Sequence, residues 1–153
     1  MKKTFFGLFF CLFILSTYAQ QSKNIPFFDS EKVLLEGIEK IRNEEYREGE
    51  RLYKTIPFGD YYYVHAQFEL STSYYLQQRN NEAIYILESL IPLESDVKKS
   101  LIYSQLGEIY YTIKMYDKAI ENYDKAIKYE PYKENWHYWK GMALLQIQEL
   151  EQA

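Results

Sequence analysis

The residues that could do chemistry are few and far apart. His65 and His137 are separated by 72 residues, and the single cysteine, Cys11, lies near the start of the 153-residue chain. Nucleophilic Cys–His catalysis and zinc binding both need several such side chains close together. The six glycines stand singly, so the sequence contains no Gly-rich phosphate-binding loop. We therefore predict a non-enzymatic protein with no catalytic residue, no metal site and no cofactor.

A run of alternating charges covers residues 42–51. It contains Glu44, Glu45, Glu48 and Glu50 with three arginines interleaved. Such a pattern is typical of a solvated helix face with ion pairs along it, and we do not interpret it as a metal site.

Aromatic residues, by contrast, are abundant. The chain has 17 tyrosines, and aromatic residues make up 18% of it. Hydrophobic residues at 47% and charged residues at 26% are ordinary values for a globular protein. Acidic residues outnumber basic ones 22 to 18, which argues against a nucleic-acid partner because such proteins usually carry a basic face.

The first segment has the pattern of a secretory signal peptide. Two lysines precede an apolar run over residues 5–15, and Thr17 and Ala19 occupy the positions that a signal peptidase reads. The run is shorter than the roughly 20 apolar residues of a transmembrane helix, although an uncleaved anchor is the alternative. We predict a signal peptide over residues 1–19, a linker over 20–29, and export to a bacterial periplasm or envelope, or secretion.

Small residues recur along the chain in one register. A first column consists of Gly37, Ser71, Gly107 and Gly141, which are separated by 34, 36 and 34 residues. Twelve residues after each of these comes a second column of Gly49, Ala83, Ala119 and Ala153. A third column, four residues further on, holds Tyr53, Leu87 and Tyr123. Columns that keep one register predict a repeat architecture.

Each period contains two helical patterns, and no segment shows sustained strand alternation. The expected helices cover residues 31–42, 44–56, 62–77, 81–91, 97–113, 116–129 and 134–147. Asp29 or Ser30 is a plausible N-cap for the first helix. Pro57, Pro92 and Pro131 end the second helix of each unit, because proline disfavours α geometry in the residue before it. The predicted fold class is all-α, an array of antiparallel helix pairs.

The third unit is similar to the tetratricopeptide repeat. The positions that carry the likeness hold Tyr103, Leu106, Gly107, Tyr110, Ala119, Tyr123, Ala126 and Pro131. Two tyrosines stand where the family prefers Trp and Phe. The resemblance implies a superhelical α-solenoid of about three and a half repeats, over about 30–63, 64–97, 100–133 and, in part, 134–153.

The two ends of the array depart from the family pattern. Glu36 and Lys40 stand where large apolar residues are expected, as a solvated capping repeat would have them. The fourth unit continues the pattern as far as Leu150 and Ala153. Either its helix is a lone cap, or the sequence is a piece of a longer array, which is the favoured interpretation.

The resemblance also implies that a stripe along the first helix of each pair lines a peptide-binding groove. The candidate partner-binding residues are His65, Phe68, Thr72, Tyr75, Ser104, Glu108, Tyr111, Tyr138 and Met142. The matching Leu34, Ile38 and Ile41 of the first unit are better explained as core. For the aromatic residues, packing against one another is an equal alternative. The Lys- and Asn-rich groove of chaperone-binding relatives is absent, so we expect no clamp for a C-terminal carboxylate.

These patterns favour a protein–protein interaction module that binds a protein or peptide partner in its concave groove. One alternative is the sensory N-terminal part of a longer membrane signalling or regulatory protein. A second is glycan binding through the groove aromatics. After signal cleavage we expect no integral membrane span.

Overall fold

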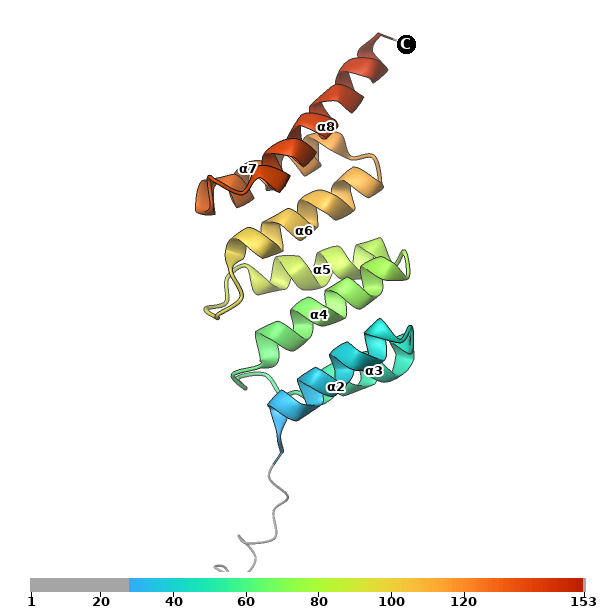
Figure 1. Ribbon diagram of the computed structural model, residues 1–153, viewed down its shortest axis with the longest axis vertical. Coiled ribbons are helices and arrows are strands. Elements are labelled where there is room, and N and C mark those ends of the chain that lie inside the picture. Colours follow the sequence, from blue (N-terminus) through green and yellow to red (C-terminus); the bar gives the residue numbers. More distant parts are fainter. Residues whose placement is uncertain (1–27, 153) are drawn as a thin grey trace, which may run out of the picture.

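Seven α-helices form an elongated stack in the computed structural model, which describes residues 28–152 (Figure 1). The helices are α2 (Ser30–Arg42), α3 (Tyr46–Thr55), α4 (Tyr63–Leu76), α5 (Asn80–Leu90), α6 (Lys99–Thr112), α7 (Tyr116–Tyr129) and α8 (Glu134–Glu151). The first six pair as hairpins, and α8 follows alone. Residues 28–152 contain no strand, so the predicted all-α fold is confirmed. The signal peptide and most of the linker lie outside the described residues.

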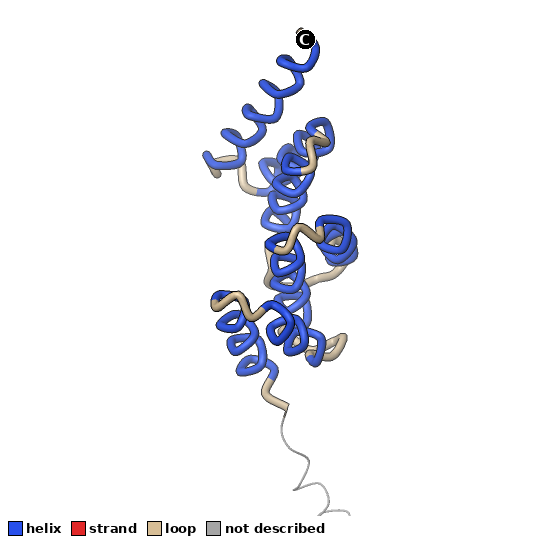
Figure 2. The backbone as a smooth tube through the Cα atoms, turned by 90° about the vertical axis from the view of Figure 1, so that its right-hand side faces the viewer, coloured by secondary structure: helices blue, strands red, loops and turns tan. Residues whose placement is uncertain are grey.

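The helices form two layers. The A helices, α2, α4, α6 and α8, lie on one side of the stack, and the B helices, α3, α5 and α7, lie on the other (Figure 2). Both ends of the stack bend toward the side of the A helices, which makes that side concave (Figure 2). Side chains from neighbouring A helices therefore come together on one continuous face.

The first three A helices, α2, α4 and α6, end in the same kind of turn. One residue in each A–B turn has a φ of 61° or 62°; these residues are Glu44, Gln78 and Lys114. The next backbone N–H donates to the carbonyl five residues earlier, at 2.8–2.9 Å, which closes the helix as in a Schellman motif. Because of this turn, α3 begins at Tyr46 instead of the predicted Glu44.

The remaining helix ends agree with the sequence pattern to within two residues, with one exception. The side chain of Asp29 caps α2 by accepting from the Lys32 N–H at 3.1 Å. α8, which was expected to end at Ile147, continues to Glu151 because neither a proline nor a left-handed residue stops it earlier.

Small residues bring the two helices of a hairpin close together. A Cβ added at Gly37 would lie 2.4 Å from the Tyr53 ring, and one at Gly107 would lie 2.8 Å from the Tyr123 ring. Glycine at these two positions therefore allows the close approach of the two helices. Gly141 stands in the same column but differs, because an added Cβ there would meet nothing within 4 Å. Among residues 28–152 no helix packs on that side of α8, which buries Ala143 instead.

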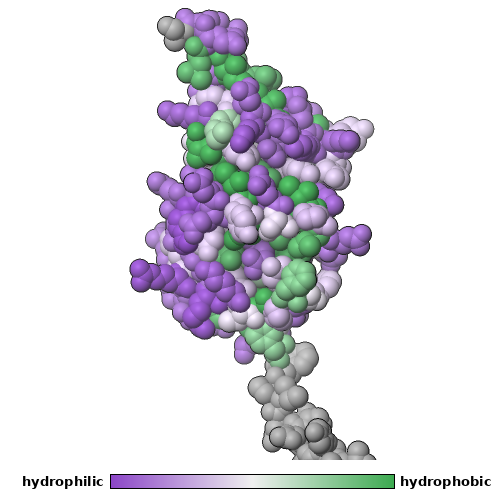
Figure 3. All heavy atoms as spheres, turned by 180° about the vertical axis from the view of Figure 1, so that it is seen from behind, coloured by the Kyte–Doolittle hydropathy of each residue, from purple (hydrophilic) through white to green (hydrophobic). Residues whose placement is uncertain are grey.

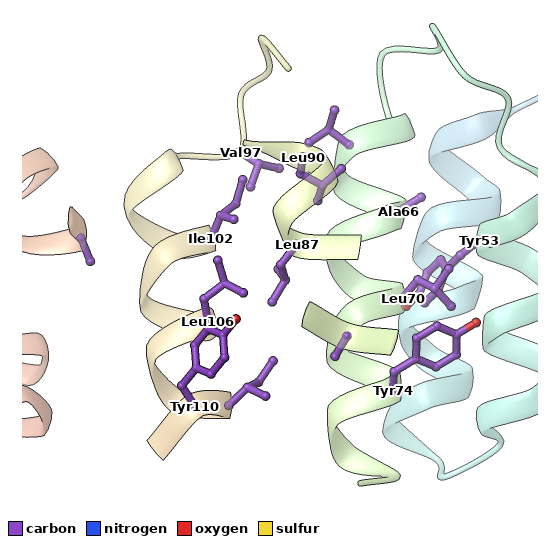
Figure 4. Close-up of a cluster of buried hydrophobic side chains, with 14 of the residues drawn as sticks. Tyr53, Ala66, Leu70, Tyr74, Leu87, Leu90, Val97, Ile102, Leu106 and Tyr110 are labelled. Atoms are coloured by element: carbon purple, nitrogen blue, oxygen red, sulfur yellow. The ribbon is translucent and has the colours of Figure 1, made fainter. Parts of the chain in front are cut away.

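Neighbouring repeats share one hydrophobic core. Leu87 and Leu90 of α5 face Ile102 and Leu106 of α6, and all four side chains are fully buried (Figure 4). Such contacts join one hairpin to the next, so each repeat is stabilised by the adjacent one. No helix within residues 28–152 is long and apolar enough to cross a bilayer.

Candidate functional site

The nine candidate residues lie on three neighbouring A helices. His65, Phe68, Thr72 and Tyr75 are half-buried on α4, and Ser104 and Tyr111 are half-buried on α6. Glu108 is exposed on α6, Tyr138 is exposed on α8, and Met142 is half-buried there. The opposite face, over the B helices, has hydrophilic side chains along its edges, with hydrophobic atoms scattered between them from the first repeats to α8 (Figure 3).

Hydrogen bonds tie the α4 part of the stripe to the α6 part. The Tyr75 hydroxyl donates to Glu108 Oε1 at 3.2 Å and lies 3.0 Å from Thr112 Oγ1. Gln105 Nε2 donates to Thr72 Oγ1 at 2.8 Å. Burial raises the pKa of Tyr75, and the negative charge of Glu108 adds to this effect, so the phenol stays protonated and able to donate.

An aromatic cluster joins α6 to α8. The Tyr111 ring lies edge-on to Tyr116 at 5.5 Å and to Trp139 at 5.6 Å between ring centroids. Trp139 in turn lies 5.3 Å from Tyr138. Tyr111 therefore packs inside the array. Tyr138 ends this cluster with 59% of its surface exposed, which leaves it available to a partner.

Some residues of the stripe take no part in these contacts between helices. Phe68 packs against the hydrophobic core, and the Ser104 hydroxyl donates to the Leu101 carbonyl of its own helix at 2.9 Å. Leu34 and Ile41 are buried in the core, as the sequence indicated. Three residues of these contacts were not predicted from the sequence, namely Gln105, Thr112 and Trp139, and each lies one position along the chain from a residue of the stripe.

The charged run over residues 42–51 is only partly a solvated face. Glu48 and Arg51 form the expected exposed pair at 2.6 Å. Glu50, however, is only 7% exposed, because the turn between α4 and α5 covers it. It accepts from Gln77 Nε2 at 2.7 Å and from Arg79 Nη1 at 3.1 Å. The interpretation of Glu50 as a solvated residue is therefore wrong.

The Glu50 cluster links the first repeat to the second. The Arg79 guanidinium also lies 4.0 Å from the centre of the Tyr74 ring, and Lys54 Nζ is 3.5 Å from Glu50 Oε2. A buried carboxylate is stable only when such partners surround it. The cluster is well placed to fix the angle between the two repeats.

The described residues offer little reactive chemistry. Among residues 28–152, no group of three or more His, Cys, Asp and Glu side chains could hold a metal ion. Glu69 on α4 is half-buried, and its burial raises the pKa of the carboxyl. His137 lies 2.8 Å from the Pro131 carbonyl oxygen, where it holds the start of α8.

Comparisons with known proteins agree with this geometry. Residues 100–133 match the sequence profile of the tetratricopeptide repeat. The fold is similar to the crystal structure of MamA, with a TM-score of 0.69 and 23% identity over 86% of this chain and 75% of that one. The crystal structure of the Sgt2 TPR domain from Aspergillus fumigatus is also similar. Its TM-score is 0.70 and its sequence identity is 21%, over 84% of this chain and 85% of that one. No curated protein matches the chain in sequence.

A third similar structure contains a ligand. The first TPR of Spaghetti (RPAP3), bound to an HSP90 peptide, has a TM-score of 0.68 and 13% identity, over 78% of this chain and 93% of that one. Residues 100–133 are thus similar in sequence to a tetratricopeptide repeat, and the described residues 28–152 have the fold of a tetratricopeptide-repeat array.

Proposed function

We propose that the chain is a protein-interaction module whose concave face binds an extended segment of a partner protein. The observation that carries the proposal is the continuous face of α4, α6 and α8. Its side chains are joined across repeats by the Tyr75–Glu108 hydrogen bond, and it ends at the exposed Tyr138. The same kind of array in RPAP3 is bound to a peptide.

The side chains of the face indicate which segment would fit. Tyr138 and Leu145 on α8 are exposed by 59% and 53%, and half-buried Met142 lies between them in sequence. Glu108 supplies a negative charge, and none of the nine candidate residues is Lys or Arg. We infer a partner segment with one or more large apolar side chains and a cationic group near them.

Tyr138 is the residue that tests this proposal most cleanly. Tyr75 and Tyr111 also stabilise the array, so their replacement would confuse binding with folding. Tyr138→Ala removes an exposed ring, and burying such a ring is typically worth about 1.5–3 kcal/mol. We expect it to weaken partner binding about tenfold or more, as a hot-spot residue does.

The measurement is affinity capture from an envelope extract with quantitative mass spectrometry. The matched control is Tyr85→Ala, because Tyr85 is 76% exposed on the B helix α5. A protein recovered by the wild type and by Tyr85→Ala, but lost with Tyr138→Ala, supports the concave face. Equal recovery by the wild type and Tyr138→Ala contradicts it.

We further propose that the chain is exported and loses residues 1–19. The support is the charged start, the short apolar run and the small residues before Gln20. N-terminal sequencing of the protein from the cell envelope or the medium should begin at Gln20. Recovery of the exported protein with the apolar run still attached would contradict cleavage.

A further inference from the structure

A pocket lies between two loops on the edge of the stack. The loop between α3 and α4 forms one wall, and the loop between α5 and α6 forms the other. Both connections leave the stack on the same side, opposite the turns within the hairpins (Figure 1). None of the nine candidate residues of the concave face lines this pocket.

Aromatic rings form much of the first wall. Phe58 is 77% exposed and Tyr61 is 67% exposed. Aromatic side chains in folded proteins are usually much more buried than this. Phe58 lies edge-on to Tyr63, with 5.2 Å between the ring centroids. The Phe58 ring therefore rests against Tyr63 while most of its surface remains open to solvent.

Carboxylates complete the pocket, and no basic side chain lines it. The lining contains Asp60, Glu94 and Asp96 but no Lys, Arg or His. None of the ion pairs found within residues 28–152 involves any of the three. The next basic residue along the second loop, Lys98, is paired with Glu130 at 2.5 Å.

Two of these carboxylates are held in place. Asp60 accepts from the Ser30 hydroxyl at 2.5 Å and from the Tyr62 N–H at 2.8 Å. The Tyr61 hydroxyl donates to Asp96 and so ties one loop to the other. Each carboxylate oxygen has lone pairs left after these bonds, so both groups can still accept from a ligand.

We propose that this pocket binds an arginine side chain of a partner protein. A guanidinium is planar, carries a permanent charge, stacks on aromatic rings and donates to carboxylates in a fork. Rings attract a cation through their negative faces, and charge-assisted hydrogen bonds to carboxylates are stronger than neutral ones. The pocket offers both on facing walls. It is a second binding surface and does not depend on the concave face.

A second acidic surface of the chain differs from this pocket because it has no aromatic rings. It lies along α2 and is lined by Glu36 among other carboxylates, but it includes Lys32 and has no aromatic residue. Carboxylates that are exposed and lack a stacking surface hold a cation weakly. This surface therefore serves as an internal control.

The test is a titration of the full-length, ¹⁵N-labelled protein with acetyl-Gly-Arg-Gly-amide, followed by NMR. We expect saturable shifts of the Gly59 and Ser95 amides, since both residues line the pocket. The peptide with citrulline in place of arginine keeps the shape but has no charge, and it should bind at least tenfold more weakly. Absence of saturable shifts at these amides, or equal binding of the citrulline peptide, would overturn the proposal.

Two variants locate the binding site. Glu94→Gln and Phe58→Ala change exposed side chains, and each should weaken binding of the arginine peptide about three- to tenfold while the rest of the spectrum stays unchanged. Glu36→Gln, on the control surface, should have no effect. A loss of affinity in Glu36→Gln equal to that in Glu94→Gln would show that only general electrostatic attraction operates.

Discussion

Gly107→Ala is expected to lower the free energy of unfolding by about 2 kcal/mol, whereas Gly141→Ala should leave it unchanged or raise it by up to about 1 kcal/mol. At position 107 the new methyl group would lie 2.8 Å from the Tyr123 ring. That ring is only 1% exposed, so it cannot move aside without opening the hairpin. At position 141 there is open space, and alanine forms helix more readily than glycine.

Urea unfolding followed by circular dichroism measures both changes. Each variant should keep the helical spectrum of the wild type, because the substitutions change the stability of the array and not its helix content. Since the two substitutions are chemically identical, any general effect of alanine cancels in the comparison. Equal free energies of unfolding for the two variants would contradict the role of Gly107 as the point of helix crossing.

Glu50→Ala should lower the free energy of unfolding by about 2–3 kcal/mol. The change leaves Gln77 and Arg79 without their common acceptor, and hydrogen bonds to charged groups are worth about 1.5–3 kcal/mol. The control is Glu48→Ala, which removes an exposed pair with Arg51 and should cost no more than about 0.5 kcal/mol. A double-mutant cycle with Arg79→Ala would isolate the coupling between the two side chains. Additive effects of Glu50→Ala and Arg79→Ala would contradict the proposed link between the repeats.

These two predictions also show what the sequence can and cannot reveal. The register of Gly37 and Gly107 fixes which side chain lies opposite each glycine, so the hairpins could be predicted from the chain alone. Gly141 stands in the same column, but its environment depends on whether a further helix packs there. A periodic pattern identifies the contact surface of a helix and says nothing of whether that surface is covered.

The charges of residues 42–51 illustrate a second limit. Glu48 and Glu50 are indistinguishable in a local pattern, yet the Glu48 side chain is 46% exposed and Glu50 is covered by the turn before Asn80. The residues that cover Glu50 belong to the following repeat, about thirty residues further along the chain. To predict that a distant segment buries a residue, one must know the angle between the repeats, and the sequence does not specify this angle directly.

The candidate binding face contains both packed and exposed residues, and the sequence could not separate them for the same reason. Tyr111 and Tyr138 both belong to the predicted stripe, but Trp139 covers the first ring and leaves the second exposed. The stripe therefore combines residues that hold α6 against α8 with residues that face solvent. The spacing of its residues predicts the stripe, and the packing of the aromatic rings decides which of its members remain exposed.

Site-specific photo-crosslinking gives the most direct test of binding at the concave face. Benzoylphenylalanine replaces Tyr138 on α8 in one protein and Tyr85 on α5 in another, two exposed positions on A and B helices. After irradiation in the cell, the protein labelled at position 138 should form a discrete adduct with its partner, and the one labelled at 85 should not. An adduct that forms at position 85 and is missing at position 138 would place the partner on the convex side and contradict the proposal.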